Sequence, residues 1–259
     1  MVRSATTFAA AIVIWIVWRA FSPDAPKLIP GRAGLLAASF YGLGSICFTV
    51  AVFNTSTANL VFILALNTMF SALLSWIFLR ERPHAATFLA MAAMIAGVLV
   101  IVGGGISGGG LLGDLVACGS AFFIAAAITV SRASGRDMGF TALIGVLPPL
   151  VMAVAMVSRT GFSIAHPWWI ILNGALIMPL SFFCLASGPK YLSAPEVSMF
   201  YLLETVFAPV WVWMIFAETP THNSLIGGVI VITALVAHSL WQIAQGRRRA
   251  ATPALRHPT

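Results

Sequence analysis

Two stretches of the sequence, 137 positions apart, repeat one another and decide the fold. Residues 56–83 read STANLVFILALNTMFSALLSWIFLRERP, and residues 193–220 read SAPEVSMFYLLETVFAPVWVWMIFAETP. Each is a long apolar run that closes on a Glu and a Pro. The ungapped alignment pairs identical residue types at Leu66/Leu203, Thr68/Thr205, Trp76/Trp213, Glu81/Glu218 and Pro83/Pro220. This self-similarity at one fixed offset predicts an internal duplication.

Apolar runs extend from these stretches in both directions. Runs of about 18 or more residues predict membrane-spanning helices, and nine are present: 4–21, 35–53, 58–79, 85–102, 111–131, 140–157, 168–187, 195–217 and 224–244. Only 8% of the 259 residues are charged, against about 25% in soluble domains. We therefore predict an all-α integral membrane protein of about nine spans, which excludes a large water-exposed catalytic domain.

The duplication divides the chain into two units. Residues 1–102 form the first repeat with four spans, 103–110 a Gly-rich linker that we expect to be flexible, 111–246 the second repeat with five spans, and 247–259 a basic tail. Because five spans are an odd number, the repeats run through the membrane in opposite directions. Such inverted repeats are typical of secondary transporters, whose substrate site lies near the midplane.

The first repeat has no counterpart for the span at 111–131, because the shift places it before Met1. We expect an initial helix to be missing, through a misplaced start codon or a shortened variant. Extending the reading frame upstream would test this expectation.

The basic residues are distributed unevenly between the two sides of the predicted membrane. Of the 14 Lys and Arg residues, 12 fall on one side, and only Arg3 and Arg159 fall on the other. The positive-inside rule then places the C-terminus on the cytoplasmic side of a bacterial inner membrane and Met1 on the outer side. We interpret the net charge of +7 as a topology signal and predict no binding of nucleic acid. Residues 4–21 are interpreted as a retained span, because cleavage there as a signal peptide would leave the basic 19–34 loop outside.

Enzymatic and metal-binding motifs are not found in the sequence. It contains no P-loop, dinucleotide-binding fingerprint, HExxH motif or Cys/His metal spacing, so we expect no enzyme, no catalytic residue, no metal site and no cofactor. Without a nucleotide site, transport would use an ion gradient or exchange. Three cysteines inside apolar runs, Cys47, Cys118 and Cys184, predict no disulfide framework.

The repeated helix pairs resemble a known family. Residues 193–237 resemble the closing helix pair of the EamA-type drug/metabolite transporters in Glu204, Pro209, Glu218 and Gly227-Gly228, and residues 56–83 resemble the matching pair with Glu81. The resemblance covers essentially the whole chain. It implies a carrier of ten helices with both ends cytoplasmic, from which this chain departs by one helix, and an exporter of amino acids or related small metabolites.

The candidate substrate site centres on Glu204. This carboxylate lies about nine residues into its predicted span, near the membrane midplane, where an ionisable group is costly unless it has a partner. Its repeat equivalent is Asn67, and Thr68 and Thr205 follow the pair. Tyr201 precedes Glu204 by about one turn. We predict that Glu204 contacts a cationic or amino group of the substrate or exchanges a proton; a structural carboxyl bonded to a neighbouring helix is the alternative.

Other polar or aromatic positions are assigned structural roles. Asp114 opens a predicted helix, where a carboxylate suits the helix dipole. His238 is interpreted as a bundle residue with satisfied hydrogen bonds, and Trp168 and Trp169 as part of the interfacial aromatic belt. Prolines inside the spans predict kinks at Pro148, Pro149, Pro179 and Pro209.

Taken together, the sequence favours a secondary transporter that exports small metabolites by alternating access between its repeats. The predicted partners are a small-molecule substrate and the lipid bilayer, with coupling to protons or exchange and a homodimer left open. Two alternatives remain: a membrane-embedded enzyme or lipid-processing scaffold, and a transport-incompetent remnant.

Overall fold

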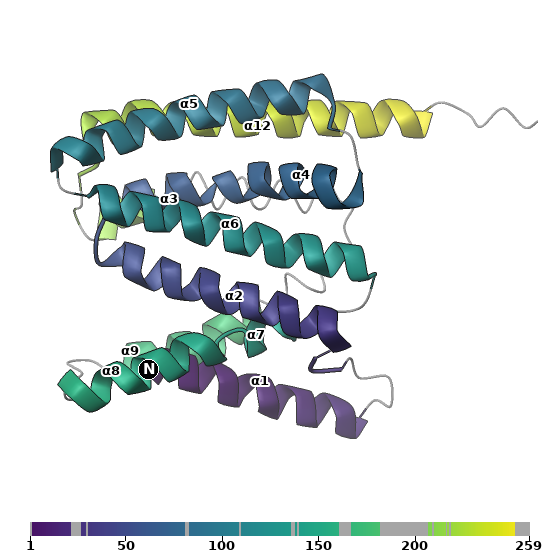
Figure 1. Ribbon diagram of the computed structural model, residues 1–259, viewed down its shortest axis with the longest axis vertical. Coiled ribbons are helices and arrows are strands. Elements are labelled where there is room, and N and C mark those ends of the chain that lie inside the picture. Colours follow the sequence, from purple (N-terminus) through teal and green to yellow (C-terminus); the bar gives the residue numbers. More distant parts are fainter. Residues whose placement is uncertain are drawn as a thin grey trace, which may run out of the picture.

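The protein is built from helices. The computed structural model describes residues 2–21, 27–29, 31–80, 83–108, 110–135, 138, 140–160, 167–181, 207–208, 210–215, 217 and 219–251. Within these ranges every regular element is helical and no strand is present (Figure 1). The prediction of an all-α membrane protein is confirmed.

Six helices are long and apolar enough to cross a membrane. They correspond to six of the nine predicted spans. Their bounds are α1 (Val2–Phe21), α2 (Gly31–Val52), α3 with α4 (Thr57–Leu64 and Leu66–Leu79), α5 (Ala85–Gly108), α6 (Leu111–Ser134) and α12 (His222–Ala251).

Two further predicted spans form shorter helices. The run at 140–157 is divided into α7 (Thr141–Ile144) and α8 (Leu147–Thr160), and the run at 168–187 forms α9 (Pro167–Leu172) and the π-helical η1 (Asn173–Ile177). Pro148 and Pro149 lie in the first turn of α8, where their missing N–H groups cost least, so a helix starts there rather than continuing. The ninth predicted span, 195–217, lies largely outside the described residues, as do Cys184 and Pro209.

The helices stack in layers (Figure 1). α5 and α12 lie side by side along one edge of the bundle, α3–α4 and α6 form the middle, and α2 follows. At the opposite edge, α1 packs with α7, α8, α9 and η1. The most extensive helix pairs are α2 with α6 and α5 with α12.

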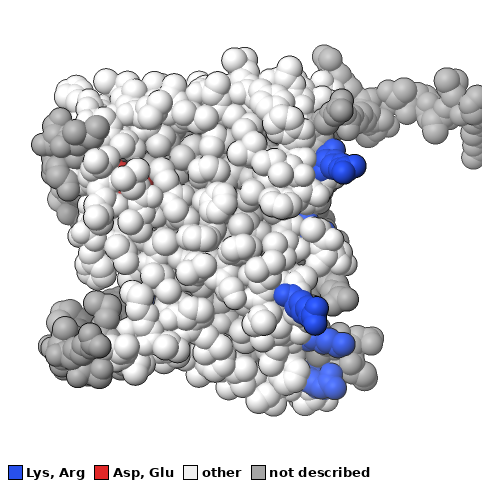
Figure 2. Space-filling view, in the orientation of Figure 1, with Lys and Arg blue, Asp and Glu red and all other residues white. Residues whose placement is uncertain are grey.

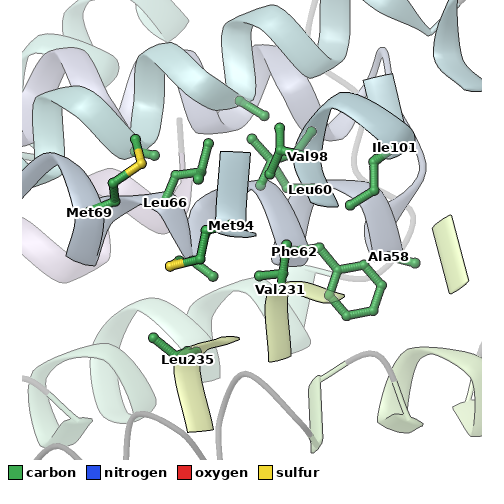
Figure 3. Close-up of a cluster of buried hydrophobic side chains, with 14 of the residues drawn as sticks. Ala58, Leu60, Phe62, Leu66, Met69, Met94, Val98, Ile101, Val231 and Leu235 are labelled. Carbon is green, nitrogen blue, oxygen red and sulfur yellow. The ribbon is translucent and has the colours of Figure 1, made fainter. Parts of the chain in front are cut away.

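The largest apolar core joins α3, α4, α5 and α12 (Figure 3), and it also includes Ala51 of α2 and Ala117 and Ala121 of α6. Leu60, Ile101 and Val231 are almost completely buried there. The ring of Phe62 lies over Gly228, where an added Cβ would come within 2.5 Å of the ring carbons. Because lipid is as apolar as these side chains, close packing rather than the exclusion of water holds such a core together.

Glycines form the seam between α5 and α12. A Cβ on Gly97 would lie 2.8 Å from the Gly227 carbonyl oxygen, and one on Gly104 would lie 2.8 Å from Asn223 Cβ. From Gly97 to Gly104 along α5, the contacting residue on α12 changes from Gly227 to Asn223, so the two helices are antiparallel. The 137-residue shift makes α5 and α12 equivalent, so antiparallel packing is the arrangement that an inverted repeat predicts.

The Gly-rich segment differs from the expected flexible linker. α5 continues as a helix through Gly108, and α6 begins at Leu111. Because glycine has no side chain, α12 can approach the backbone of α5 closely, as it does at Gly104. The helix is retained because its neighbour supplies the contacts.

Basic side chains gather at one end of the bundle, the right-hand end in Figure 2. Arg19 lies in the last turn of α1, Arg80 caps α4, and Arg132 lies in the last turn of α6. All three helices end on this side, and α2, with Arg32 in its first turn, begins there (Figure 1). The segregation of charge proposed from the sequence is therefore present in three dimensions among the described residues.

Candidate functional site

A tightened turn within one helix places two of the predicted site residues. The span from Thr57 to Leu79 is one apolar helix of 23 residues, in which α3 passes into α4 at Ala65 while the backbone of Ala65 stays in the right-handed helical region. Both the Thr68 N–H and the Thr68 hydroxyl donate to the Ala65 carbonyl oxygen, at 3.3 and 2.9 Å. Asn67 is half-buried and Thr68 is exposed. The bond from the Thr68 N–H spans three residues, as in a 3₁₀ turn, and such a turn in the middle of a helix often marks a functional position.

A polar face runs along α4 from this break. Asn67, Ser71 and Ser75 recur at every fourth position, so they lie on one side of the helix. Ser75 is buried, and its hydroxyl has no hydrogen-bond partner within the described part of the chain. A buried hydroxyl without a partner, such as that of Ser75, favours a polar or hydrated path along this face of α4. The spacing of four was visible in the sequence, but Ser71 and Ser75 were not predicted as site residues.

The other half of the predicted site lies outside the described residues. Tyr201, Glu204 and Thr205 belong to the range 182–206, whose structure is not described. Their convergence with Asn67 and Thr68 therefore stays a prediction from the repeat.

A second polar cluster joins three helices at the end opposite the arginines. Asp114, in the first turn of α6, is fully buried. Its Oδ1 accepts hydrogen bonds from the Thr55 hydroxyl at 2.5 Å and from Asn59 Nδ2 at 3.4 Å. On its other side, the Asn59 Oδ1 accepts from the hydroxyl of Ser224 in α12. We call these four residues the outer polar junction.

The outer polar junction is packed as well as bonded. Ser224 is fully buried, and its N–H donates to the hydroxyl of Thr221, 3.2 Å away, which caps α12. A Cβ on Gly113 would collide with the Asn54 carbonyl oxygen, because the first turn of α6 presses on the corner between α2 and α3. Sequence reasoning missed Asn59 and Ser224, since residues 165 positions apart give no local signal of a shared hydrogen bond.

The remaining predicted residues have structural surroundings. His238 is half-buried, and its Nε2 lies 3.0 Å from Gln242 Nε2, one turn along the same helix. Its Nδ1 has no hydrogen-bond partner within the described part of the chain, so the expectation of satisfied hydrogen bonds is met at Nε2 alone. Its ring stacks on Trp241. Trp168 and Trp169 are each 68% exposed at the start of α9, as an interfacial position requires. No group of three or more potential metal ligands is found among the described residues.

The matches to known proteins follow the same division into two halves. The EamA-like transporter family matches this chain at residues 1–103 and again at 111–240. The chain belongs to this family. It is thus a multi-pass membrane transporter rather than an enzyme.

Individual relatives are distant. The chain is 22% identical over 198 residues to the "Pseudopaline exporter CntI" of Pseudomonas aeruginosa, in strains UCBPP-PA14 and PAO1, covering 75% of this chain and 70% of the exporter. A solved structure titled "Crystal structure of protein" superposes with a TM-score of 0.63 at 14% identity. The superposition covers 93% of this chain and 87% of the chain in the solved structure. This likeness supports the fold alone.

Proposed function

We propose that this transporter is a secondary exporter of small metabolites such as amino acids or related compounds. Export takes place by alternating access between the two inverted repeats. The observation that carries the proposal is the polar face of α4, which includes the buried, unpartnered hydroxyl of Ser75 and lies in a bundle whose two halves both match a transporter family. The similarity to an exporter supports the direction of transport.

The substrate site of this proposal combines Asn67 and Thr68 with Glu204, Thr205 and Tyr201. The amide of Asn67 offers both donors and an acceptor, and Glu204 supplies a negative charge. Such a set suits a substrate with an amino group beside other polar groups. Coupling to a proton gradient or to exchange is part of the same proposal, since no nucleotide motif supplies energy.

A transport assay with paired variants tests this function. Proteoliposomes containing the protein are assayed for counterflow of labelled amino acids, polyamines, purines and pseudopaline. A protein that transports one of them is expected to lose most of this activity in Asn67→Ala and Glu204→Gln. Ser39→Ala is the matched control, because the Ser39 hydroxyl is exposed and donates within its own helix to the Leu35 carbonyl oxygen.

Two results would contradict the proposal. Wild-type rates in both Asn67→Ala and Glu204→Gln would remove these residues from the site. Well-folded protein that transports no member of the panel would count against this substrate class. A thermal-shift screen in detergent measures ligand binding independently of transport, since a ligand that binds the native state raises its melting temperature.

A further inference from the structure

Asp114 combines complete burial with an oxygen that has no partner. Its exposed fraction is 0%. Both hydrogen bonds that it accepts go to Oδ1, from Thr55 and Asn59. Among the described residues Oδ2 has no hydrogen-bond partner. A buried polar atom left unpaired costs about 1–3 kcal/mol, so a fold that keeps one needs a reason.

The helix dipole does not supply that reason. A carboxylate that merely complements the start of a helix does so from the surface of the first turn, where both oxygens remain hydrated. Asp114 instead points into the junction of α3, α6 and α12, and the side chains that bond to it are neutral. An ionised carboxylate held in this way is much more costly than a neutral acid.

Few ionisable groups surround this carboxylate. Helices α3, α4 and α5 carry no titratable side chain anywhere along their length. Those on the other packed helices are Cys118 and Arg132 of α6, Arg32, Tyr41 and Cys47 of α2, and His222, His238 and the arginines at 247–249 of α12. Arg32 and Arg132 lie at the opposite end of the bundle, and His222 is exposed.

The hydrogen bonds already made within the outer polar junction limit what it can bind. Metal ions such as Ca²⁺ and Mg²⁺ need six or more oxygen ligands, yet here the Asn59 oxygen already accepts from Ser224 and the Thr55 hydroxyl already donates to Asp114. The collision expected for a Cβ at Gly113 shows that the corner is also tightly filled. One free carboxylate oxygen in a closed junction fits a proton.

We propose that Asp114 is a proton-binding site and that Oδ2 is the atom that takes the proton. Proton binding converts the carboxylate to a neutral acid, while Oδ1 continues to accept from Thr55 and Asn59. Through Asn59 the site is bonded to Ser224, so it joins α3 of the first repeat to α6 and α12 of the second. The proposal concerns proton binding by the folded protein and holds whatever the exported compound is.

Infrared difference spectroscopy tests the proposal without a transport assay. Purified protein in lipid nanodiscs is measured at acid and alkaline pH, and the carboxylic-acid C=O band is followed. Wild type is expected to show this band at acid pH and to lose it on alkaline titration. Asp114→Asn should lose the component of this band that belongs to the buried acid, whereas the components from the other six Asp and Glu residues remain. Glu204→Gln is the matched control, because it removes another carboxylate predicted inside a span and should retain the Asp114 component.

A second variant keeps the test decisive if Asp114→Asn fails to elute as a folded protein. Thr55→Val leaves the carboxyl in place but removes the hydroxyl that donates to Oδ1, so the band should persist at a shifted frequency. A titrating band that is unchanged in Asp114→Asn, or unshifted in Thr55→Val, would overturn the assignment. The complete lack of such a band in wild type would overturn it as well.

Discussion

Asn59 joins three helices of the described bundle through polar contacts. Its amide donates to Asp114 and accepts from Ser224, so one side chain links α3 to both α6 and α12. Asn59 is only 8% exposed. An amide is suited to this position because it offers a donor and an acceptor at once. At the scale of single residues, the stability of the outer polar junction depends on both ends of this amide.

Ser224→Ala is expected to destabilise the protein by roughly 1–3 kcal/mol, because the Asn59 oxygen loses its donor inside the bundle. Interhelical hydrogen bonds in membranes average about 0.6 kcal/mol, which favours the lower half of this range. Reversible unfolding in mixed micelles measures the effect.

A double-mutant cycle separates this bond from its surroundings. Asn59→Leu, Ser224→Ala and the double variant should show a coupling energy of about 0.5 kcal/mol or more, as expected for residues in contact. Ser39→Ala should change stability by no more than a few tenths of a kcal/mol, since its hydroxyl bonds within one exposed turn. Strict additivity of the two single substitutions would show that the bond contributes nothing.

At the scale of elements, glycine decides how helices pair. Gly97 and Gly227 bring α5 and α12 into backbone contact, whereas Gly103, six residues further along the same helix, has nothing within 4 Å of an added Cβ. Two glycines of one helix thus have opposite environments, which the sequence alone does not distinguish.

Gly97→Ala is expected to destabilise the protein by roughly 1–3 kcal/mol, because the new methyl group must displace the α12 backbone. Gly103→Ala, the matched control, should be neutral or stabilising by up to about 1 kcal/mol, because alanine is the better helix former. Unfolding of both variants under the same conditions checks this pair. Equal effects in the two would contradict the proposed close contact at Gly97.

At the scale of the whole molecule, charge fixes orientation. Arg19, Arg32, Arg80 and Arg132 lie at one end of the bundle, where basic side chains gather (Figure 2). The outer polar junction lies at the start of α6, at the other end from Arg132. We propose that the arginine-rich end faces the cytoplasm of a bacterial inner membrane.

Reporter fusions test this orientation. A green fluorescent protein joined after Ala251 should fluoresce, because it folds in the cytoplasm, and one inserted after Lys27 should do the same. Alkaline phosphatase fused after Asn54, in the loop at the opposite end, should be active. The reverse pattern at all three positions would contradict the proposed topology.

The fold was largely predictable because each membrane helix satisfies its own backbone hydrogen bonds and so leaves a local signal. The apolar runs located the six long helices within a few residues. The run at 140–157 was less well predicted, because a helix starts anew at its prolines. The run at 168–187 is described only to Ser181, as one helix that passes through the π-helical η1. The candidate substrate site was predictable only in part: Asn67 is seen half-buried on the polar face of α4, whereas Glu204 lies outside the described residues.

The sequence by itself determined the class of protein: membrane-spanning helices, two repeats and a sided distribution of charge. These follow from composition, period and offset, which are properties of the chain. The tertiary structure alone decided which residues meet. Asp114 was interpreted from sequence as a helix-start carboxylate, and only the packing of α3 and α12 against it reveals complete burial and an unpartnered oxygen. Contacts between residues 55 and 165 positions apart depend on how helices pack, which local patterns do not encode.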